Sequence, residues 1–133
     1  MPTLNTARES LYQAFIDGWA GATPVAFAGE DYESGSTAWV RFSMQNEDST
    51  QNTMGVSGNR YFTRQGRVFV QIFTPINAGM YDADTLAEAA RTILEGKTID
   101  GVHIYGVSTR EVGPDGQWFF TLVEAPFTYF TLK

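Results

Sequence analysis

The period of the hydrophobic pattern changes once within residues 60–94, and this change constrains the fold more than any other feature. Residues 68–73 alternate between an aliphatic set and a set that is aromatic at both ends: Val68, Val70 and Ile72 against Phe69, Gln71 and Phe73. Because neither set is polar throughout, the pattern predicts a central strand that is covered on most of both faces. Pro75 has no N–H to donate to a neighbouring strand, so we expect it to end this one.

A helix is predicted after this strand and a hairpin before it. Apolar residues recur at helical spacing beyond Pro75: Leu86, Ala90, Ile93 and Leu94. Asp82 or Asp84 can cap the start of this helix, and Gly96 is placed to end it. The Gln65-Gly66 pair stands between two apolar runs, which is the pattern of a tight hairpin turn.

The rest of the chain reads as one helix and several strands. Residues 3–18 predict a first amphipathic helix with an apolar stripe: Leu4, Leu11, Phe15 and Ile16. Strands are predicted at 25–28, 37–45, near 54–56 and at 102–112, and a last long strand follows the GPDG turn at 113–116. Pro126 requires an edge position or a break in that strand. The window 45–53 has no apolar residue and predicts a solvated hairpin loop, or a projecting contact loop.

These elements predict a single α+β domain over residues 1–133. Its mostly antiparallel or mixed sheet carries two amphipathic helices packed on one face. More aromatic side chains are then expected on the other face than one copy can cover: Trp39, Phe69, Phe73, Tyr105, Trp118, Phe119, Tyr129 and Phe130. Since an exposed apolar surface of this size usually marks a protein contact, we expect the chain to form an oligomer.

Composition excludes several kinds of function. Nine basic residues stand against fifteen acidic ones, for a net charge of −6, which argues against a grip on nucleic-acid phosphates but is compatible with lining a passage for DNA. The absence of cysteine excludes disulfides, thiolate zinc sites and cysteine nucleophiles, and fits a reducing compartment. No signal peptide is recognised at the N-terminus, and no apolar run approaches the ~20 residues that span a bilayer. We expect a soluble protein without a membrane partner.

No residue pattern predicts catalysis, a metal site or a cofactor. His103 is the sole histidine, and no GxSxG, GxGxxG or GxxxxGK[ST] motif occurs. The acidic residues near Glu30 and Glu47 do not match a calcium-binding loop. Three arginines, Arg60, Arg64 and Arg67, are predicted around the hairpin turn. We interpret them as subunit-contact or structural residues, with contact to a phosphate as the alternative.

Four segments together resemble a known family: ARESLYQAFI, GNRYFTRQGRVFVQIFTPINAG, DADTLAEAARTILEGKTIDGVHI and GPDGQWFFTLVEAPFTYF. They are similar to the small tail-terminator proteins of long-tailed bacteriophages, over most of the chain from residue 3, with little of the match between 28 and 53. The resemblance implies an α+β protein without catalytic activity or cofactor. It implies a ring, usually of six subunits, that ends polymerisation of the tail tube and docks to the head connector, with genome DNA passing through without specific binding.

On this interpretation the protein is assembled in the host cytoplasm and resides in the virion, at the head–tail junction. The subunit-interface candidates are Arg60, Arg64, Arg67, Phe69 and Phe73. Glu47 and Asp48 are the candidates for the lumen or for loop contacts. Two alternatives stay open: a small α+β enzyme or ligand-binding domain with an aromatic pocket between sheet and helices, and another component of the same junction, such as a connector or tube protein.

Overall fold

The computed structural model describes residues 4–19, 23–27, 38–51, 53–58, 60–76, 81–115 and 118–132. These residues form two helices and seven strands in the order α1 (Leu4–Trp19), β1 (Val25–Phe27), β2 (Trp39–Gln51), β3 (Tyr61–Pro75), α2 (Tyr81–Leu94), β4 (Thr98–Ile99), β5 (Val102–Ile104), β6 (Ser108–Asp115) and β7 (Trp118–Leu132).

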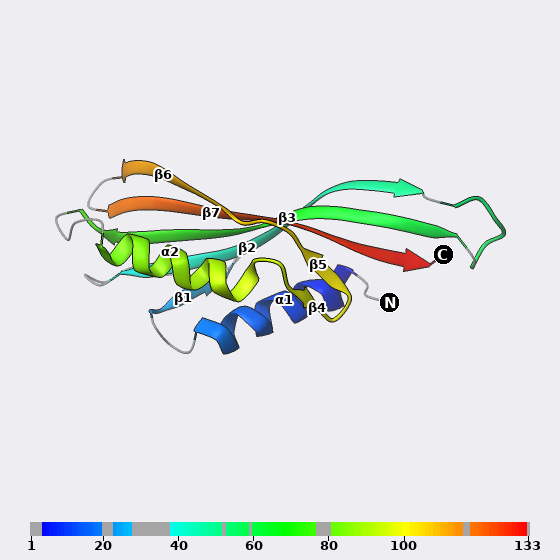
Figure 1. Cartoon of the computed structure of the whole chain (residues 1–133), viewed down its shortest axis with the longest axis horizontal. Helices are drawn as coiled ribbons and strands as arrows, with labels where there is room; N and C mark the ends of the chain where they lie inside the picture. Colours follow the sequence, from blue (N-terminus) through cyan, green and yellow to red (C-terminus); the bar gives the residue numbers. More distant parts are fainter. Residues whose placement is uncertain are drawn as a thin grey trace.

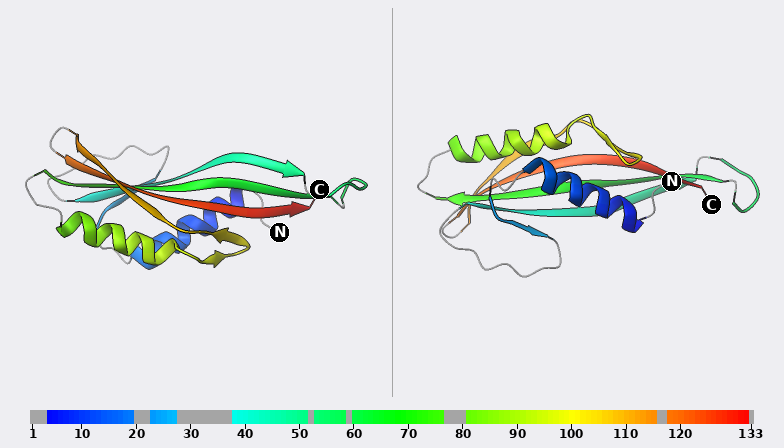
Figure 2. Two further views of the ribbon diagram at one scale, coloured as in Figure 1. Left: turned by 45° about the horizontal axis from the view of Figure 1, so that its top comes forward. Right: turned by 90° about the horizontal axis from the view of Figure 1, so that it is seen from below.

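The strands form one mixed sheet in the order β1-β2-β3-β7-β5-β4, and β6 also pairs with β7. Only β1 and β2 are parallel within this described sheet; the other pairs are antiparallel. Both helices lie on one side of the sheet (Figure 2), and their buried residues share one core cluster with those of the sheet. The predicted α+β architecture is confirmed.

The strand predicted to be central is central. β3 lies between β2 and β7, and Val68, Val70 and Ile72 are completely buried beneath the helices. In the register, Val70 lies opposite Phe42 on one side and Val123 on the other. As predicted, Pro75 is the last residue of β3. The alternation of residues 68–73 therefore set both the position and the orientation of this strand.

The stripe predicted for helix α1 is confirmed at Leu11 and Phe15 and wrong at Leu4 and Ile16. Its buried residues repeat every four positions: Ala7, Leu11, Phe15 and Trp19. The Phe15 ring lies 5.1 Å from the Trp19 ring and 4.6 Å from the Phe42 ring of β2. Leu4 and Ile16 were expected in the stripe, but they are 50% and 44% exposed because they lie outside this i, i+4 row.

The hairpin predicted at Gln65-Gly66 is wrong, because β3 continues through both residues. A Cβ atom built at Gly66 would lie 2.3 Å from the Gln45 carbonyl oxygen and 2.7 Å from the Phe127 ring. The register of β2 against β3 shifts at the same level, between Asn46 and Asp48. Glycine is therefore required here by the close approach of neighbouring strands at a β-bulge, and not by a turn.

The loop predicted at residues 45–53 is also mostly wrong, since β2 extends to Gln51 and pairs with β3 up to Phe62. The turn falls later, at residues 53–58, where a strand had been predicted near 54–56. Residues 45–51, 61–67 and 126–132 form a three-stranded extension, the arm, which projects past the helices (Figure 1). The polar composition of residues 45–51 does not indicate a loop, because these residues pair with β3 as a strand, while Phe127 and Tyr129 on β7 of the same arm belong to the core.

Strand 102–112 was predicted as one element and is two, because β5 and β6 pair with different parts of β7. β6 reaches Glu124 and β5 begins at Phe127, so β7 changes its neighbour around Pro126. The N–H of Tyr105 donates to the Pro126 carbonyl at 3.0 Å on this side of β7. The break predicted in the last strand at Pro126 is therefore wrong, because β7 is continuous through it; the proline lies where the neighbour of β7 changes from β6 to β5.

Candidate subunit-contact surfaces

A row of alternating charges crosses four strands on the face of the sheet away from the helices, the open face. Arg67 of β3 pairs with Glu47 of β2 and with Glu124 of β7, both at 3.1 Å. Glu124 also binds Arg110 of β6 at 3.3 Å. The Glu124 side chain is 20% exposed, and the two arginines and Glu47 are 43–68% exposed. Solvent screening limits what each pair contributes, so this row orients the strands more than it stabilises them.

The β-bulge explains how Glu47 comes to face Arg67. Asn46 lies opposite Gly66 and Asp48 lies opposite Gln65, so Glu47 is the extra residue of the bulge. Bulges turn a side chain to a new direction, and here the carboxylate is turned onto the guanidinium. The structure thus joins a predicted interface residue, Arg67, to a predicted lumen residue, Glu47. The side chain of Asp48 lies outside the described residues.

Three aromatic rings form a second row on the open face. Trp39, Phe73 and Phe120 lie side by side on β2, β3 and β7, with centroids 4.3 Å and 5.2 Å apart. Arg41 adds a cation–π contact, 5.6 Å above the Trp39 ring. The predicted interface residue Phe69 lies on the same face as Phe73, four residues before it on β3, and both are half-buried.

The open face exposes less aromatic surface than predicted. Trp39 is only 8% exposed, within the stacked row. Tyr129 is 3% exposed and lies on the helix side of the sheet, opposite Arg64. Burial raises the pKa of Tyr129, and the nearby charges of Arg64 and Arg8 oppose that rise. Tyr105 and Phe130 remain substantially exposed, at 53% and 42%.

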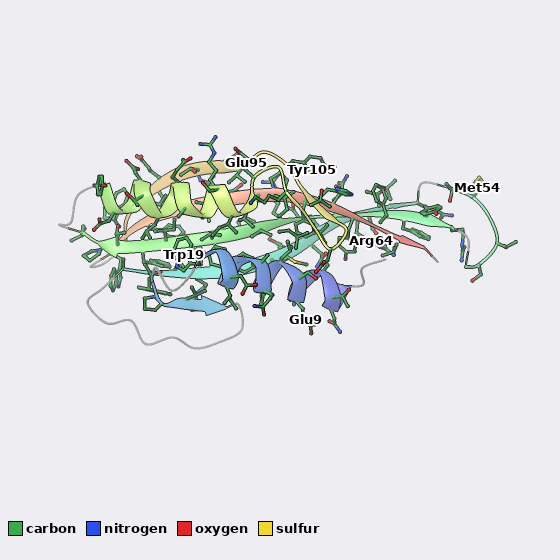
Figure 3. All side chains as sticks on the ribbon, turned by 60° about the horizontal axis from the view of Figure 1, so that its bottom comes forward. Glu9, Trp19, Met54, Arg64, Glu95 and Tyr105 are labelled. Atoms are coloured by element: carbon green, nitrogen blue, oxygen red, sulfur yellow. The ribbon has the colours of Figure 1, made fainter. Side chains whose placement is uncertain are left out.

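The three predicted arginines do not form a cluster. Arg64 and Arg67 are three residues apart on one strand, so their side chains leave opposite faces of the sheet. Arg64 donates to the Thr131 hydroxyl at 3.1 Å and to the Ser49 hydroxyl, and lies 5.0 Å above the Phe62 ring (Figure 3 labels Arg64). These three side chains in contact with Arg64 are neutral. Arg60 precedes β3, at the end of the loop.

The tip of the arm carries exposed apolar side chains that the sequence reading placed in a strand. Met54 is 96% exposed and Val56 is 71% exposed (Figure 3). The loop is closed at its base, where Gln51 Nε2 donates to the Thr53 carbonyl at 3.0 Å and the Tyr61 N–H donates to the Thr53 hydroxyl at 2.9 Å. Two apolar residues separated by Gly55 and followed by Gly58, in a polar window, are the sequence feature that points to such a tip.

A shallow hollow of about 510 Å³ lies along the outer side of α2. Its lining residues recur at helical spacing and combine a tyrosine, two carboxylates and small side chains: Tyr81, Asp84, Thr85, Glu88, Ala89 and Thr92. Tyr81 is 79% exposed. This surface was not predicted from the sequence, because the hydrophobic periodicity of α2 indicates only its core-facing stripe and the hollow lies on the opposite one.

Glu95 fixes the chain between α2 and β6. Its carboxylate accepts hydrogen bonds from the Val107 N–H at 2.9 Å and from Arg91 Nε at 3.2 Å. These two interactions, with the Val107 N–H the larger, lower the pKa of Glu95 below its ordinary value of 4.5. Figure 3 shows Glu95 beside the segment that carries Tyr105.

His103 lies in a structural setting. Its Nδ1 is 3.0 Å from the Thr98 hydroxyl, and its ring contacts that of Phe130 edge-on at 6.4 Å. Nearby, the Tyr105 hydroxyl is 2.9 Å from the Thr128 hydroxyl. These contacts join β4, β5 and β7, and they do not place an acid on His103 to orient it as a base.

In the part of the chain that the structure describes, no three His, Asp or Glu side chains come together as a metal site. Neither of the two helices in that part is long and apolar enough to cross a bilayer. The surfaces that remain are the charged row, the aromatic row, the arm tip and the α2 hollow.

No protein-family model matches the chain, and no curated protein matches it with significance. The fold does match proteins of known structure. One of them, whose name carries no functional information, aligns with 97% of this chain and 96% of its own at a TM-score of 0.71 and 13% identity. This likeness concerns the fold alone. The class that fold and surfaces define is an α+β domain with two helices on one face of a mixed sheet and a projecting three-stranded arm.

Proposed function

We propose that the protein is a structural component of a long-tailed bacteriophage: a tail terminator that forms a ring at the head-proximal end of the tail tube. In this role it ends tube polymerisation and joins the tail to the head connector, while genome DNA passes through the lumen without specific binding. The partners are further copies of the chain, six in the simplest case, the tail tube protein and the connector. The family assignment comes from the resemblance carried by the motifs in residues 58–79 and 82–104.

The observation that carries the proposal is the arm. Among the described strands, β1 pairs with β2 only over Val40–Phe42, so the outer edge of β2 beyond Phe42 has no strand beside it for nine residues. On the other side, the described β5 pairs with β7 no further than Thr128. Free edges of this length invite pairing with other chains unless they are protected. Neighbouring subunits in a ring would cover these edges. Without such a neighbour, the arm would leave strand edges open to aggregation.

The mechanism of such a protein is geometric. One side of the ring complements the last ring of tube subunits, and the other side lacks the surface that recruits another one, so growth stops. The net charge of −6 supports a lumen that does not retain DNA, because like charges repel. Glu47 stays a lumen candidate, although its ion pair with Arg67 offsets part of its negative charge.

A ligand-binding domain or enzyme with a pocket between sheet and helices is less well supported. The space between those layers is filled by completely buried side chains, among them Phe15, Phe42, Val70 and Leu94. The hollow along α2 opens on the outer surface, where a small ligand would lose little contact with water. A different component of the same junction, such as a connector or tube protein, has the same structural support as a terminator.

Negative-stain imaging of the purified protein, alone and mixed with tail tubes of the phage that encodes it, separates these functions. A terminator gives rings in isolation and a single ring on one end of each tube. A tube protein gives extended tubes, and a connector gives rings that do not bind to tubes. Monomers under all conditions, with no density on tube ends, would remove the proposal.

A further inference from the structure

We propose that the arm tip of one copy docks into the α2 hollow of a second copy. This contact rests on the proposed function, because it specifies how neighbouring copies in the ring hold one another. The occupant of the hollow is thus the loop of residues 53–58 of the next subunit, centred on Met54 and Val56.

The positions of the two surfaces require the contact to be between copies. The tip lies at one end of the long axis of the molecule, and α2 lies over the opposite half (Figure 1). One copy cannot bring its own tip to its own hollow. A contact between two different surfaces is heterologous, and such contacts close into a ring when the rotation per subunit permits it.

Both surfaces offer apolar side chains to water. Met54 and Val56 project from a loop closed at Thr53, which limits the entropy that docking would cost. Methionine is flexible and adapts to irregular surfaces such as a shallow hollow. The hollow offers the exposed Tyr81 ring and the methyl group of Ala89 as apolar surface. Docking therefore removes apolar side chains of both partners from water.

The charges are complementary as well. The outer part of the arm with its tip, residues 49–64, carries two arginines, Arg60 and Arg64, and no carboxylate, against the acidic balance of the whole chain. Helix α2 carries three carboxylates and one arginine, and two of those carboxylates, Asp84 and Glu88, line the hollow. Glu88 forms an ion pair with Arg91 at the long distance of 3.8 Å, and the Glu88 side chain is 69% exposed. Arg64 contacts the neutral side chains of Thr131 and Phe62. Opposite potentials of this kind favour the proposed pairing over other orientations.

The absence of cysteine makes the contact testable by disulfide formation. Met54→Cys and Thr85→Cys are made as separate variants; both positions are exposed, so both proteins are expected to fold. The two are mixed under mild oxidation, and mixed disulfide dimers are counted by mass spectrometry. Disulfides require the two Cα atoms to approach within about 7 Å, so only a specific contact gives efficient cross-linking. The matched control pairs Met54→Cys with Glu9→Cys, an exposed position on α1 (Figure 3).

We expect the Met54→Cys and Thr85→Cys mixture to give at least about tenfold more mixed dimer than the control, because a docked pair raises the effective thiol concentration. A double variant, M54C/T85C, is expected to give a covalent ladder that ends at the copy number of the ring. Rings in native mass spectrometry with cross-linking no higher than the control would overturn the contact and leave the proposed function intact. Absence of any oligomer of the wild-type protein, with no cross-linking, would overturn both.

Discussion

Gly66 on β3 lies directly opposite Phe127 on β7, and the Phe127 ring occupies the space that a side chain at position 66 would need. The Gln45 carbonyl oxygen closes the same space from the other side, at 2.3 Å from an ideal Cβ. Three strands are thus in closest contact at the junction of the helix-covered body and the arm. The glycine that resembles a hairpin residue in the sequence is a packing residue.

Gly66→Ala is therefore expected to lower the free energy of unfolding by about 1–3 kcal/mol, as for other insertions into a packed site. The Gln45 backbone cannot move away without disturbing the β-bulge. Urea denaturation measures the change. Gly106→Ala is the control, since no atom lies within 4 Å of a Cβ there. Equal stability of both variants would show that the strands are further apart than described.

The charged row of the open face predicts a measurable coupling between Arg67 and Glu124. Double-mutant cycles with alanine are expected to give about 0.5–1 kcal/mol, because both side chains are partly exposed and the interaction is screened. The coupling should fall when salt is raised to 1 M. The i, i+3 pair of Glu88 and Arg91, at 3.8 Å, serves as the comparison and should couple more weakly. A larger value for the helix pair would contradict the role given to Glu124.

The lowered pKa of Glu95 predicts a pH effect on the segment after β5. Since the folded-state pKa is below the unfolded value, the carboxylate contributes stability that is present above about pH 4.5 and is lost as the pH falls through the folded-state pKa. Protonation removes an acceptor from the Val107 N–H. The protection factor of the Val107 amide, its exchange rate corrected for the intrinsic effect of pH, is therefore expected to fall on acidification relative to amides in the core of β3.

Glu95→Gln tests the same assignment at neutral pH. The variant loses the carboxylate charge, so Val107 should exchange faster at pH 7 and lose its additional acceleration at low pH. Glu9→Gln, an exposed change on α1, should leave Val107 unchanged. Protection of Val107 that is identical in wild type and Glu95→Gln at every pH would show that another group holds this amide.

The sequence predicts those features of the structure that residues close together in the chain determine. Val68, Val70 and Ile72 identified the central strand, and Pro75 and Gly96 ended β3 and α2 as predicted, because periodicity and backbone chemistry act within a few residues. The turn predicted at Gly66 was wrong, since a glycine needed for close strand approach looks in sequence like a glycine needed for a turn. The loop predicted over the polar window 45–51 was wrong as well, because strand pairing outside the core needs no apolar residue.

The candidate surfaces were predictable only in part. Arg67 and Glu47 were assigned to different roles, and their ion pair depends on a β-bulge that the sequence did not indicate. Phe69 and Phe73 were correctly placed on one face by alternation. The tip residues Met54 and Val56 became visible as a surface only when the turn was located three residues after the end of β2.

The arm tip gives a prediction on assembly. Val56→Asp places a charge in an exposed apolar loop, so the free energy of unfolding should stay within about 0.5 kcal/mol of wild type. The fraction of protein in oligomers, measured by mass photometry, should fall at least about tenfold if the tip is buried between copies. Thr109→Asp, the same charge at an exposed position on β6, is the control and should assemble as wild type does.

The central claim is that this chain is a ring-forming protein of the head–tail junction, and one measurement tests it most directly. Purified protein is added to growing tail tubes of the phage that encodes it, and tube lengths and ends are scored by electron microscopy. The account predicts that tubes stop growing and carry one added ring at a single end. Tubes that continue to elongate without an added ring, at protein concentrations above that of tube subunits, would contradict it.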